Sequence, residues 1–326
     1  MRRRDFVAAI GAATAWPLAA RAQQGERVRR ISVVTGTDES QEIVANLVVF
    51  KNELAKLGWR EGRNLRIDER FGRGDADRIR AIATEIVHLG PDAIVAVGAV
   101  MVRVLQRLTQ TIPIVTIAAG DVFADGLVKN PSHPEGNVTG VTNLFRSIAG
   151  KWIELLKDAV PPVQRVGYIH NAQLPQPLDL FPEVENAARV LGVRAAAIPF
   201  QNAVDLAHAI DTFAAEPDGG LVVSGNVTAP YRATINTLAI QYRLPTVHLD
   251  RERLVEGGLI AYAPHLADLA RRGASFANRI LRGAKVGDLP VEYPTRFALF
   301  VNLKTARAMG LTIPETFLQR ADEVIE

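Results

Sequence analysis

Small, hydroxyl and amide residues stand where the apolar runs of this chain end, and these residue types are well suited to contact a ligand. The runs end in Thr35-Gly36-Thr37, Gly98-Ala99-Val100, Ala119-Gly120-Asp121, Asn171, Ser224-Gly225-Asn226 and Asp250. In open parallel sheets, ligands lie beyond the carboxyl ends of the strands. These residues offer hydrogen bonds and, at helix N-termini, backbone N–H groups. Turns use the same residue types, so only the whole set indicates a function, and it favours binding over bond-making.

Catalytic motifs are absent from the sequence. There is no G-x-S-x-G nucleophile turn and no G-x-x-x-x-G-K-[ST] phosphate loop. Asp121 and Asp250 both follow apolar runs, as a pair of catalytic carboxylates would, but they fall in different halves of the chain. Asp is also common in turns after strands. Since no nucleophile–base pair emerges, we predict that the protein is not an enzyme.

A glycine-rich tetrapeptide and six histidines raise the question of a cofactor or a metal. "GRGD" at 72–75 precedes a predicted helix, but the third glycine of a dinucleotide fingerprint is missing, since residue 77 is Asp. A turn with Asp75 as helix N-cap is the better interpretation. No histidine has zinc-motif spacing, and the chain has no cysteine, which excludes disulfides and thiolate sites. His170 and His248 lie near strand ends, where packing within the fold is the likelier of two interpretations and a ligand contact the other. We predict no cofactor and no metal.

Strands and helices that would position these residues alternate along the chain. Apolar runs indicate strands at 29–36, 64–71, 92–98, 112–120, 165–171, 194–200, 219–226, 245–250 and 257–264. Helical spacing of apolar residues occurs at 40–57, 75–89, 100–109, 149–159, 181–191, 203–214, 230–242, 266–281 and 303–310. The alternation predicts an α/β fold of parallel sheets covered by helices on both faces. Ser40 is the expected N-cap of its helix and Gly58 the residue that ends it.

Three polar or proline-marked breaks interrupt the alternation, near residues 140, 258 and 292. Two similar halves joined by three crossings would account for all three breaks. We therefore predict one lobe from residues 28–140 plus 259–290 and a second from 141–258 plus 291–326. Each lobe is expected to be a doubly wound parallel sheet.

The first 22 residues are interpreted as a cleavable export signal. A basic head is followed by the apolar run 6–20, which is shorter than the roughly 20 residues of a membrane span. Arg3-Arg4-Asp5-Phe6 fits the twin-arginine pattern, and Ala20-Arg21-Ala22 fits signal peptidase, with cleavage after Ala22. A buried N-terminal helix is the alternative. The prediction is a periplasmic protein.

Removing this segment changes the charge balance. The whole chain has 38 basic and 35 acidic residues, and residues 1–22 hold four of the former and one of the latter. The remainder therefore has 34 of each and a formal net charge of zero. Nucleic-acid binding through bulk charge loses its support, and we predict no nucleic-acid partner.

Several stretches resemble one family. They are "WPLAARAQQ", "GDVFADGLVKNPSHPEGNVTGVT" (120–142), "KWIELLKDAVPPVQRVGYI" (151–169) and the C-terminal 289–326. They look like the ABC-transporter substrate-binding proteins that include tryptophan-binding lipoproteins and twin-arginine-exported members, and the resemblance covers essentially the whole chain. It implies a type I periplasmic-binding fold, with two doubly wound lobes joined by three crossover segments and one small ligand between them.

The resemblance also implies a route for the ligand and a role for the 136–141 stretch. The partners would be a small molecule and an inner-membrane ABC permease, with the binding protein a monomer. "GNVTGV" would be the first crossing, where Gly136 and Gly140 permit backbone change.

This sequence departs from the family pattern beside the predicted ligand. Members often have T-G-G-T-P where this chain has Val97-Gly98-Ala99-Val100-Met101, and T-G-G-D-P where it has Ala118-Ala119-Gly120-Asp121-Val122. Methyl groups replace hydroxyls, so Val100, Ala118 and Ala119 are expected to form an apolar wall.

The expected ligand has an aromatic or branched apolar body and a carboxylate-like head. The polar contacts predicted for it are Thr35, Thr37, Gly98, Gly120, Asp121, Thr142, Asn171, Asn226 and Asp250. Sugars should bind poorly, because their hydroxyls would remain unpaired against methyl groups. An exported sensor that presents a small molecule to a membrane receptor is the alternative function with the same fold.

Overall fold

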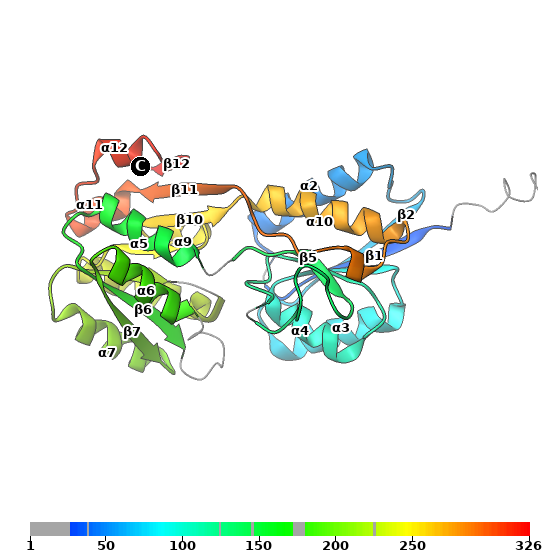
Figure 1. Ribbon diagram of the computed structural model, residues 1–326, viewed down its shortest axis with the longest axis horizontal. Coiled ribbons are helices and arrows are strands. Elements are labelled where there is room, and N and C mark those ends of the chain that lie inside the picture. Colours follow the sequence, from blue (N-terminus) through cyan, green and yellow to red (C-terminus); the bar gives the residue numbers. More distant parts are fainter. Residues whose placement is uncertain (1–26, 38, 124, 145–146, 172–179, 224–225) are drawn as a thin grey trace, which may run out of the picture.

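The computed structural model describes residues 27–37, 39–123, 125–144, 147–171, 180–223 and 226–326, and these form two α/β lobes that lie side by side along the long axis (Figure 1). The predicted export signal 1–22 and its cleavage site lie outside the described residues. No helix within the described ranges is long and apolar enough to cross a membrane.

The first lobe is a five-stranded sheet, all parallel, in the order β2-β1-β3-β4-β5. Its strands are β1 Arg29–Thr35, β2 Leu65–Phe71, β3 Ala93–Val97, β4 Ile114–Ile117 and β5 Val138–Val141. Its helices are α2 Gln41–Lys56, α3 Ala76–Leu89, α4 Ala99–Leu108 and α10 Leu266–Leu281. Figure 1 shows α2 and α10 on one side of the sheet and α3 and α4 on the other.

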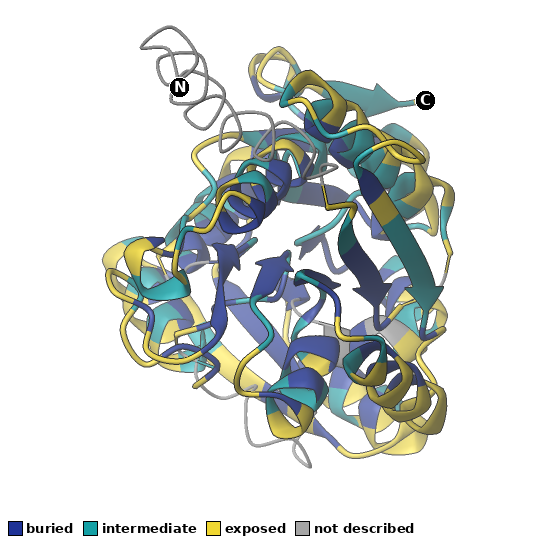
Figure 2. Cartoon of the chain, turned by 90° about the vertical axis from the view of Figure 1, so that its right-hand side faces the viewer, coloured by how far each residue is buried: buried dark blue, intermediate teal, exposed yellow. Residues whose placement is uncertain are grey.

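Both faces of this sheet are apolar, as expected for a parallel sheet covered on both sides. Along β1, Ile31 and Val33 pack into the core beneath α2 and α10, whereas Val34 packs into the core beneath α3 and α4. Successive side chains of a strand point to opposite faces, so one strand supplies both cores. Viewed from the end of the molecule, buried strands lie inside a ring of helices whose outer faces are exposed (Figure 2).

The second lobe has seven strands in the order β12-β11-β10-β9-β8-β6-β7. They are β6 Arg165–Asn171, β7 Arg194–Phe200, β8 Gly219–Val223, β9 Thr246–His248, β10 Ile260–Pro264, β11 Phe297–Asn302 and β12 Glu323–Ile325. The helices are α5 Ile148–Ala159, α6 Phe181–Val190, α7 Ala203–Ala214, α8 Arg232–Gln241, α9 Glu252–Val255, α11 Leu303–Met309, α12 Glu315–Leu318 and the 3₁₀ turn η2 Asn226–Tyr231. A further 3₁₀ turn, η3, spans Val286–Asp288.

The predicted fold class, two doubly wound lobes of the type I periplasmic-binding fold, is confirmed, with one difference in strand direction. β10 and β11 are antiparallel, while the other pairs in both sheets are parallel. The reversal follows from the chain path, because α10 and the segment after it lie against the first lobe before β11 returns to the second sheet.

The second crossing falls later than the sequence indicated. We expected residues 259–290 in the first lobe, but β10 pairs with β9 and β11 in the second sheet, and the chain crosses at His265 before α10 begins. The apolar pattern of β10 would be the same in either lobe, because the periodicity of a strand does not indicate which sheet the strand joins.

The first crossing also lies beyond the stretch predicted for it. Val138–Val141 is β5, the edge strand of the first sheet, so the chain leaves this lobe after Val141 rather than within "GNVTGV". The third crossing runs beside it, because Thr142 N donates to Glu292 O at 2.9 Å and Glu292 N donates to Gly140 O at 2.9 Å. The second and third are joined by His265 N donating to Arg296 O at 3.3 Å.

Gly140 is required by close packing, which differs from the flexible role expected for it. Its φ is +135°, and a Cβ there would lie 2.2 Å from Thr116 O and 2.6 Å from Thr116 N on β4. Gly136, with φ +102°, has no atom within 4 Å of such a Cβ. Gly140 therefore lets two strands pair, and Gly136 serves a turn.

Gly140→Ala should lower the stability of the first lobe by about 3 kcal/mol, because β5 must move away from β4. Gly136→Ala should cost about 1 kcal/mol, the backbone penalty alone. Thermal unfolding monitored by circular dichroism measures both. Equal losses in the two variants would contradict the packing role of Gly140.

Candidate ligand-binding site

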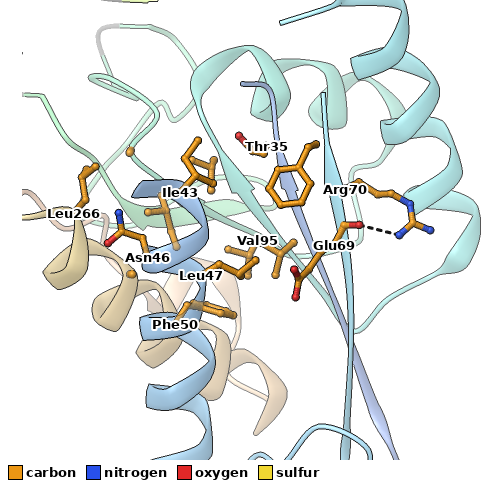
Figure 3. A pocket seen from close by; sticks show the side chains of 15 residues that line it. Thr35, Ile43, Asn46, Leu47, Phe50, Glu69, Arg70, Val95 and Leu266 are labelled. Carbon is orange, nitrogen blue, oxygen red and sulfur yellow. Dashed lines mark hydrogen bonds between the residues drawn. The ribbon is translucent and has the colours of Figure 1, made fainter. Parts of the chain in front are cut away.

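A hollow of about 650 Å³, counting the part that opens to solvent, lies in the first lobe beneath α2 and α10 (Figure 3). Strand residues at its floor come from the carboxyl ends of four strands, since the last residues of β1, β2, β3 and β4 all line it: Thr35, Phe71, Val97 and Ile117. This is the edge of a parallel sheet where ligands bind.

Two parallel helices, α2 and α10, form the roof of the hollow. Near their C-terminal ends, Trp59 Nε1 donates to Asn278 Oδ1 at 3.0 Å, and Arg282 Nη2 donates to Leu57 O at 3.1 Å. Towards their N-terminal ends, Asn46 of α2 and Leu266 of α10 line the hollow instead (Figure 3). The helices are therefore tied at one end and leave apolar sheet surface uncovered at the other.

Apolar side chains dominate the walls. α2 contributes Ile43, Leu47 and Phe50, and α10 contributes Leu266 and Ala270. Phe50 is 2% exposed, whereas Ile43 and Leu47 remain half-buried although they face the sheet. The sequence contained a signal for this partly exposed apolar surface. Residues 43–50 carry apolar side chains on more of the helix circumference than a single buried face requires.

The β1 loop at the mouth of the hollow is held by the "GRGD" turn. Gly72 N donates to Thr35 O at 2.8 Å, and Gly74 N donates to Gly36 O at 2.8 Å. Asp75 caps α3 by accepting from Arg78 N at 2.7 Å. The prediction of a turn with an Asp N-cap is confirmed, and this turn positions the predicted ligand residues Thr35 and Thr37.

Thr35 and Thr37 interact with each other. Their hydroxyls lie 3.0 Å apart, and Thr37 N donates to Thr35 Oγ1 at 3.2 Å. Thr35 is buried and lines the hollow, while Thr37 is exposed. The pair can offer a hydroxyl to a ligand at the mouth.

Other predicted contacts in the first lobe are engaged within the fold. Gly98 is the N-cap of α4 with φ +90°, and Gly120 N donates to Asn143 Oδ1 at 2.7 Å. Asp121 is buried and accepts from Phe123 N at 3.2 Å. Thr142 is fully buried, and its hydroxyl donates to Leu144 O at 3.0 Å. The Thr142 hydroxyl is therefore occupied in stabilising the first crossing.

The predicted apolar wall of Val100, Ala118 and Ala119 does not form as one surface. Ala118 lines the hollow, with φ +53°. Ala119 is completely buried in the core on the other face of the sheet. Val100 is 54% exposed at the start of α4, which also covers that other face. Side chains of neighbouring residues at a strand end point to opposite faces of the sheet. Ala118 and Ala119 therefore cannot belong to the same wall.

In the second lobe, Asp250 is the predicted site residue whose side chain the structure describes, and it forms hydrogen bonds within the fold. Asp250 accepts from Arg253 N at 3.1 Å and pairs with Arg253 Nε at 2.5 Å, at the start of α9. Asn171 ends β6 and Asn226 begins η2, but their side chains lie outside what the structure describes. Their predicted role as amide contacts stays a prediction.

Aromatic residues at the crossings were missed by the sequence reasoning. Tyr293 lies on the third crossing, and its side chain is 38% exposed. The pKa of its phenol is raised mainly by partial burial and secondly by the negative charge of Asp121. Tyr262 and Phe297, on β10 and β11, stack with ring centroids 5.0 Å apart. The proline-flanked "EYPTRF" was the available signal, since aromatic side chains are frequent in ligand sites.

Charged residues of the second lobe, Asp250, Arg251 and Glu252, act on Glu42 in the first turn of α2. The pKa of Glu42 is raised by burial first, and then by the charges of Glu252 and Asp250, while Arg251 acts in the opposite direction. A carboxylate at a helix N-terminus is ordinarily favoured by the helix dipole, but burial outweighs that here. The hollow therefore lies at the end of the first lobe that faces the second.

Metal and proton-transfer chemistry find little support among the described residues. No group of three or more His, Asp or Glu side chains there is arranged to hold a metal. Burial, and then Arg253, lowers the pKa of His248 to about 3, and its Nε2 lies 3.0 Å from Thr246 Oγ1. A neutral, packed histidine is the result. His170 is also buried, and burial lowers its pKa.

Comparison with known proteins supplies the family. The family described as "ABC transporter substrate binding protein" matches residues 30–325. A tyrosine-binding protein of Clostridioides difficile (strain R20291) is 23% identical over 262 residues, which are 80% of this chain and 75% of that protein.

Two solved structures share the fold. An ABC domain in complex with L-Trp from Streptococcus pneumoniae has a TM-score of 0.80 at 23% identity and covers 91% of this chain and 99% of that one. The ligand-free, open structure of a substrate-binding protein with adhesive properties from Clostridium difficile has a TM-score of 0.74 at 23% identity, over 91% and 99% of the two chains. At this identity the structures establish the architecture.

Glu42→Gln should make the protein more heat-stable at pH 7. The folded state binds the Glu42 proton more tightly than the unfolded chain does, so stability falls as the pH rises from the ordinary value of 4.5 through the raised pKa. The gain should vanish near pH 4, where wild type is protonated as well. Melting temperatures measured between pH 4 and 8 test this, with exposed Glu39→Gln as the control. A gain that is the same at pH 4 and pH 7 would contradict the assignment.

Proposed function

This chain belongs to the ABC transporter substrate-binding protein family, and we propose that it binds one small organic molecule between its two lobes and delivers it to an ABC permease. The hollow beneath α2 and α10 is the observation that supports this proposal most, because apolar side chains of both helices and of the sheet line it at the carboxyl ends of the strands, where ligands bind in open parallel sheets. The protein would act as a monomer in the periplasm.

The proposed ligand has an aromatic or branched apolar body and a carboxylate-like head. An aromatic ring system buries about 150–250 Å², which at about 25 cal/mol per Å² is worth about 4–6 kcal/mol before the cost of association. An exposed helix N-terminus adds about 0.3–1 kcal/mol for an anion. The apolar body is thus the larger contribution, in line with relatives named for tyrosine and bound to tryptophan.

Polar contacts for the head are proposed on both lobes. Thr35 and Thr37 lie at the mouth of the hollow, and Gly98 stands at the N-terminus of α4, where backbone N–H groups favour an anion. Asn171 and Asn226 would approach from the second lobe when the lobes close. Tyr293 on the third crossing is a further candidate.

Sensing is the alternative use of the same binding event. An exported sensor would hand the bound molecule's signal to a membrane receptor instead of a permease, with identical lobes and an identical pocket. Purified permease separates the two, since a transport protein stimulates ATP hydrolysis by its permease complex when the ligand is bound, and a sensor does not.

Thermal-shift screening of aromatic acids, branched and aromatic amino acids, and sugars should give shifts with the first two groups. A strong shift with a sugar and none with the acids would contradict the ligand class. Small-angle X-ray scattering of the same mixtures should show contraction with the ligand that binds. Unchanged scattering with confirmed binding would argue against lobe closure.

Export is proposed to use the twin-arginine route, with cleavage after Ala22. The intact mass of periplasmic protein should correspond to a chain that begins at Gln23. Changing Arg3 and Arg4 together to Lys should leave uncleaved protein in the cytoplasm. Undiminished export of that variant would point to the general secretion route.

A further inference from the structure

We propose that the hollow of the first lobe is the pocket for the ring of the bound molecule, and that the Asn46 amide selects a ring that carries a hydrogen-bonding atom, such as an indole N–H or a phenol O–H. The inference rests on the proposed function, since it assigns a subsite to the same ligand. It replaces the apolar wall of Val100 and Ala119, which the fold separates.

The lining of the hollow suits an apolar group. Leu47 and Phe50 come from α2, Leu266 from α10, and Val95 from the sheet (Figure 3). Ring-sized groups gain most when they are buried among such side chains. Thr35 lines the hollow at the carboxyl end of β1, and Leu266, which directly follows the crossing at His265, lines it as well. A ring inside the hollow would therefore leave its polar head between the lobes.

Asn46 is out of place among these neighbours. It is half-buried inside α2, where Asn is a poor helix former because its amide competes with backbone hydrogen bonds. Figure 3 shows its amide on the side of α2 towards Leu266 of α10. No other residue in the described part of the chain forms a hydrogen bond with this amide, which leaves a donor and an acceptor at the edge of the hollow.

The other polar side chains of the lining already have partners. Glu69 pairs with Lys51, and Arg70 donates to Glu85 Oε1 at 2.7 Å and to Glu69 O at 2.9 Å. Thr35 pairs with Thr37. Asn46 alone among the polar lining residues has no partner within the described residues, so its half-buried amide is available to bond to a ligand in place of water.

This arrangement predicts selectivity among rings of similar size. An indole N–H or phenol O–H pairs with Asn46 Oδ1, and the gain comes on top of ring burial. An unsubstituted phenyl ring displaces water from Asn46 without replacing its hydrogen bond, which is costly for a polar group. Sites built around a hydrogen bond reject analogues that lack the matching atom.

The first experiment compares Asn46→Leu with wild type by isothermal titration of tryptophan, tyrosine and phenylalanine. Leucine keeps an apolar wall and is a better helix former. Tryptophan or tyrosine, whichever binds tighter to wild type, should lose about tenfold in affinity, while phenylalanine should be unchanged or gain. Equal changes for all three amino acids would overturn the role of Asn46.

A second experiment tests the pocket itself with a filled variant. Leu47→Trp places a large ring in the hollow, and Val48→Trp puts the same ring on the next residue, which is 51% exposed and does not line the hollow. Ligand affinity should fall at least tenfold in the first variant and stay unchanged in the second. Should Leu47→Trp fail to fold, Ile43→Trp with Val44→Trp provides the equivalent pair on the same helix.

Indole and para-cresol, which are rings without an amino-acid head, separate this inference from the proposed function. If amino acids bind and Leu47→Trp leaves their affinity intact, the ring pocket is wrong and the proposed function stands. If no amino acid binds but indole or para-cresol binds to wild type and not to Leu47→Trp, the pocket stands and the proposed ligand is wrong. If neither the amino acids nor the rings bind, both are overturned.

Discussion

A parallel sheet with two apolar faces has to be covered by helices on both sides, and the first lobe meets this requirement incompletely. α2 and α10 are tied near their C-terminal ends by the hydrogen bond from Trp59 to Asn278. Towards their N-terminal ends they leave the hollow, and Ile43 and Leu47 stay half-buried. Apolar surface left uncovered in this way is stabilised most readily by a ligand that removes it from water. The binding proposal follows from this packing deficit.

The same helix carries the charge that faces the other lobe. Glu42 lies in the first turn of α2, and its pKa is raised by burial first and then by Glu252 and Asp250 of the second lobe, with Arg251 acting in the opposite direction. One helix therefore borders both the hollow and the space between the lobes.

Polar residues at strand ends were the starting point of the functional reasoning, and many of them serve the fold. Thr142 holds the first crossing, Gly120 binds the Asn143 side chain, and Asp250 caps and pairs with Arg253. Buried loop groups need hydrogen-bond partners whether or not a ligand is present. Residue type alone cannot separate these roles. Asn46, whose side chain has no hydrogen-bond partner among the described residues, lay inside a predicted helix rather than at a strand end.

The sequence by itself determined the alternation of strands and helices, the two lobes, the Ser40 and Asp75 caps and the family, because periodicity and capping are local and the motifs are contiguous. Tertiary structure decided which sheet β10 joins, why residue 140 must be glycine, and that Ala118 and Ala119 face opposite cores. It alone placed the hollow, since that volume is the space between α2, α10 and the sheet, and packing between elements distant in sequence leaves no local pattern.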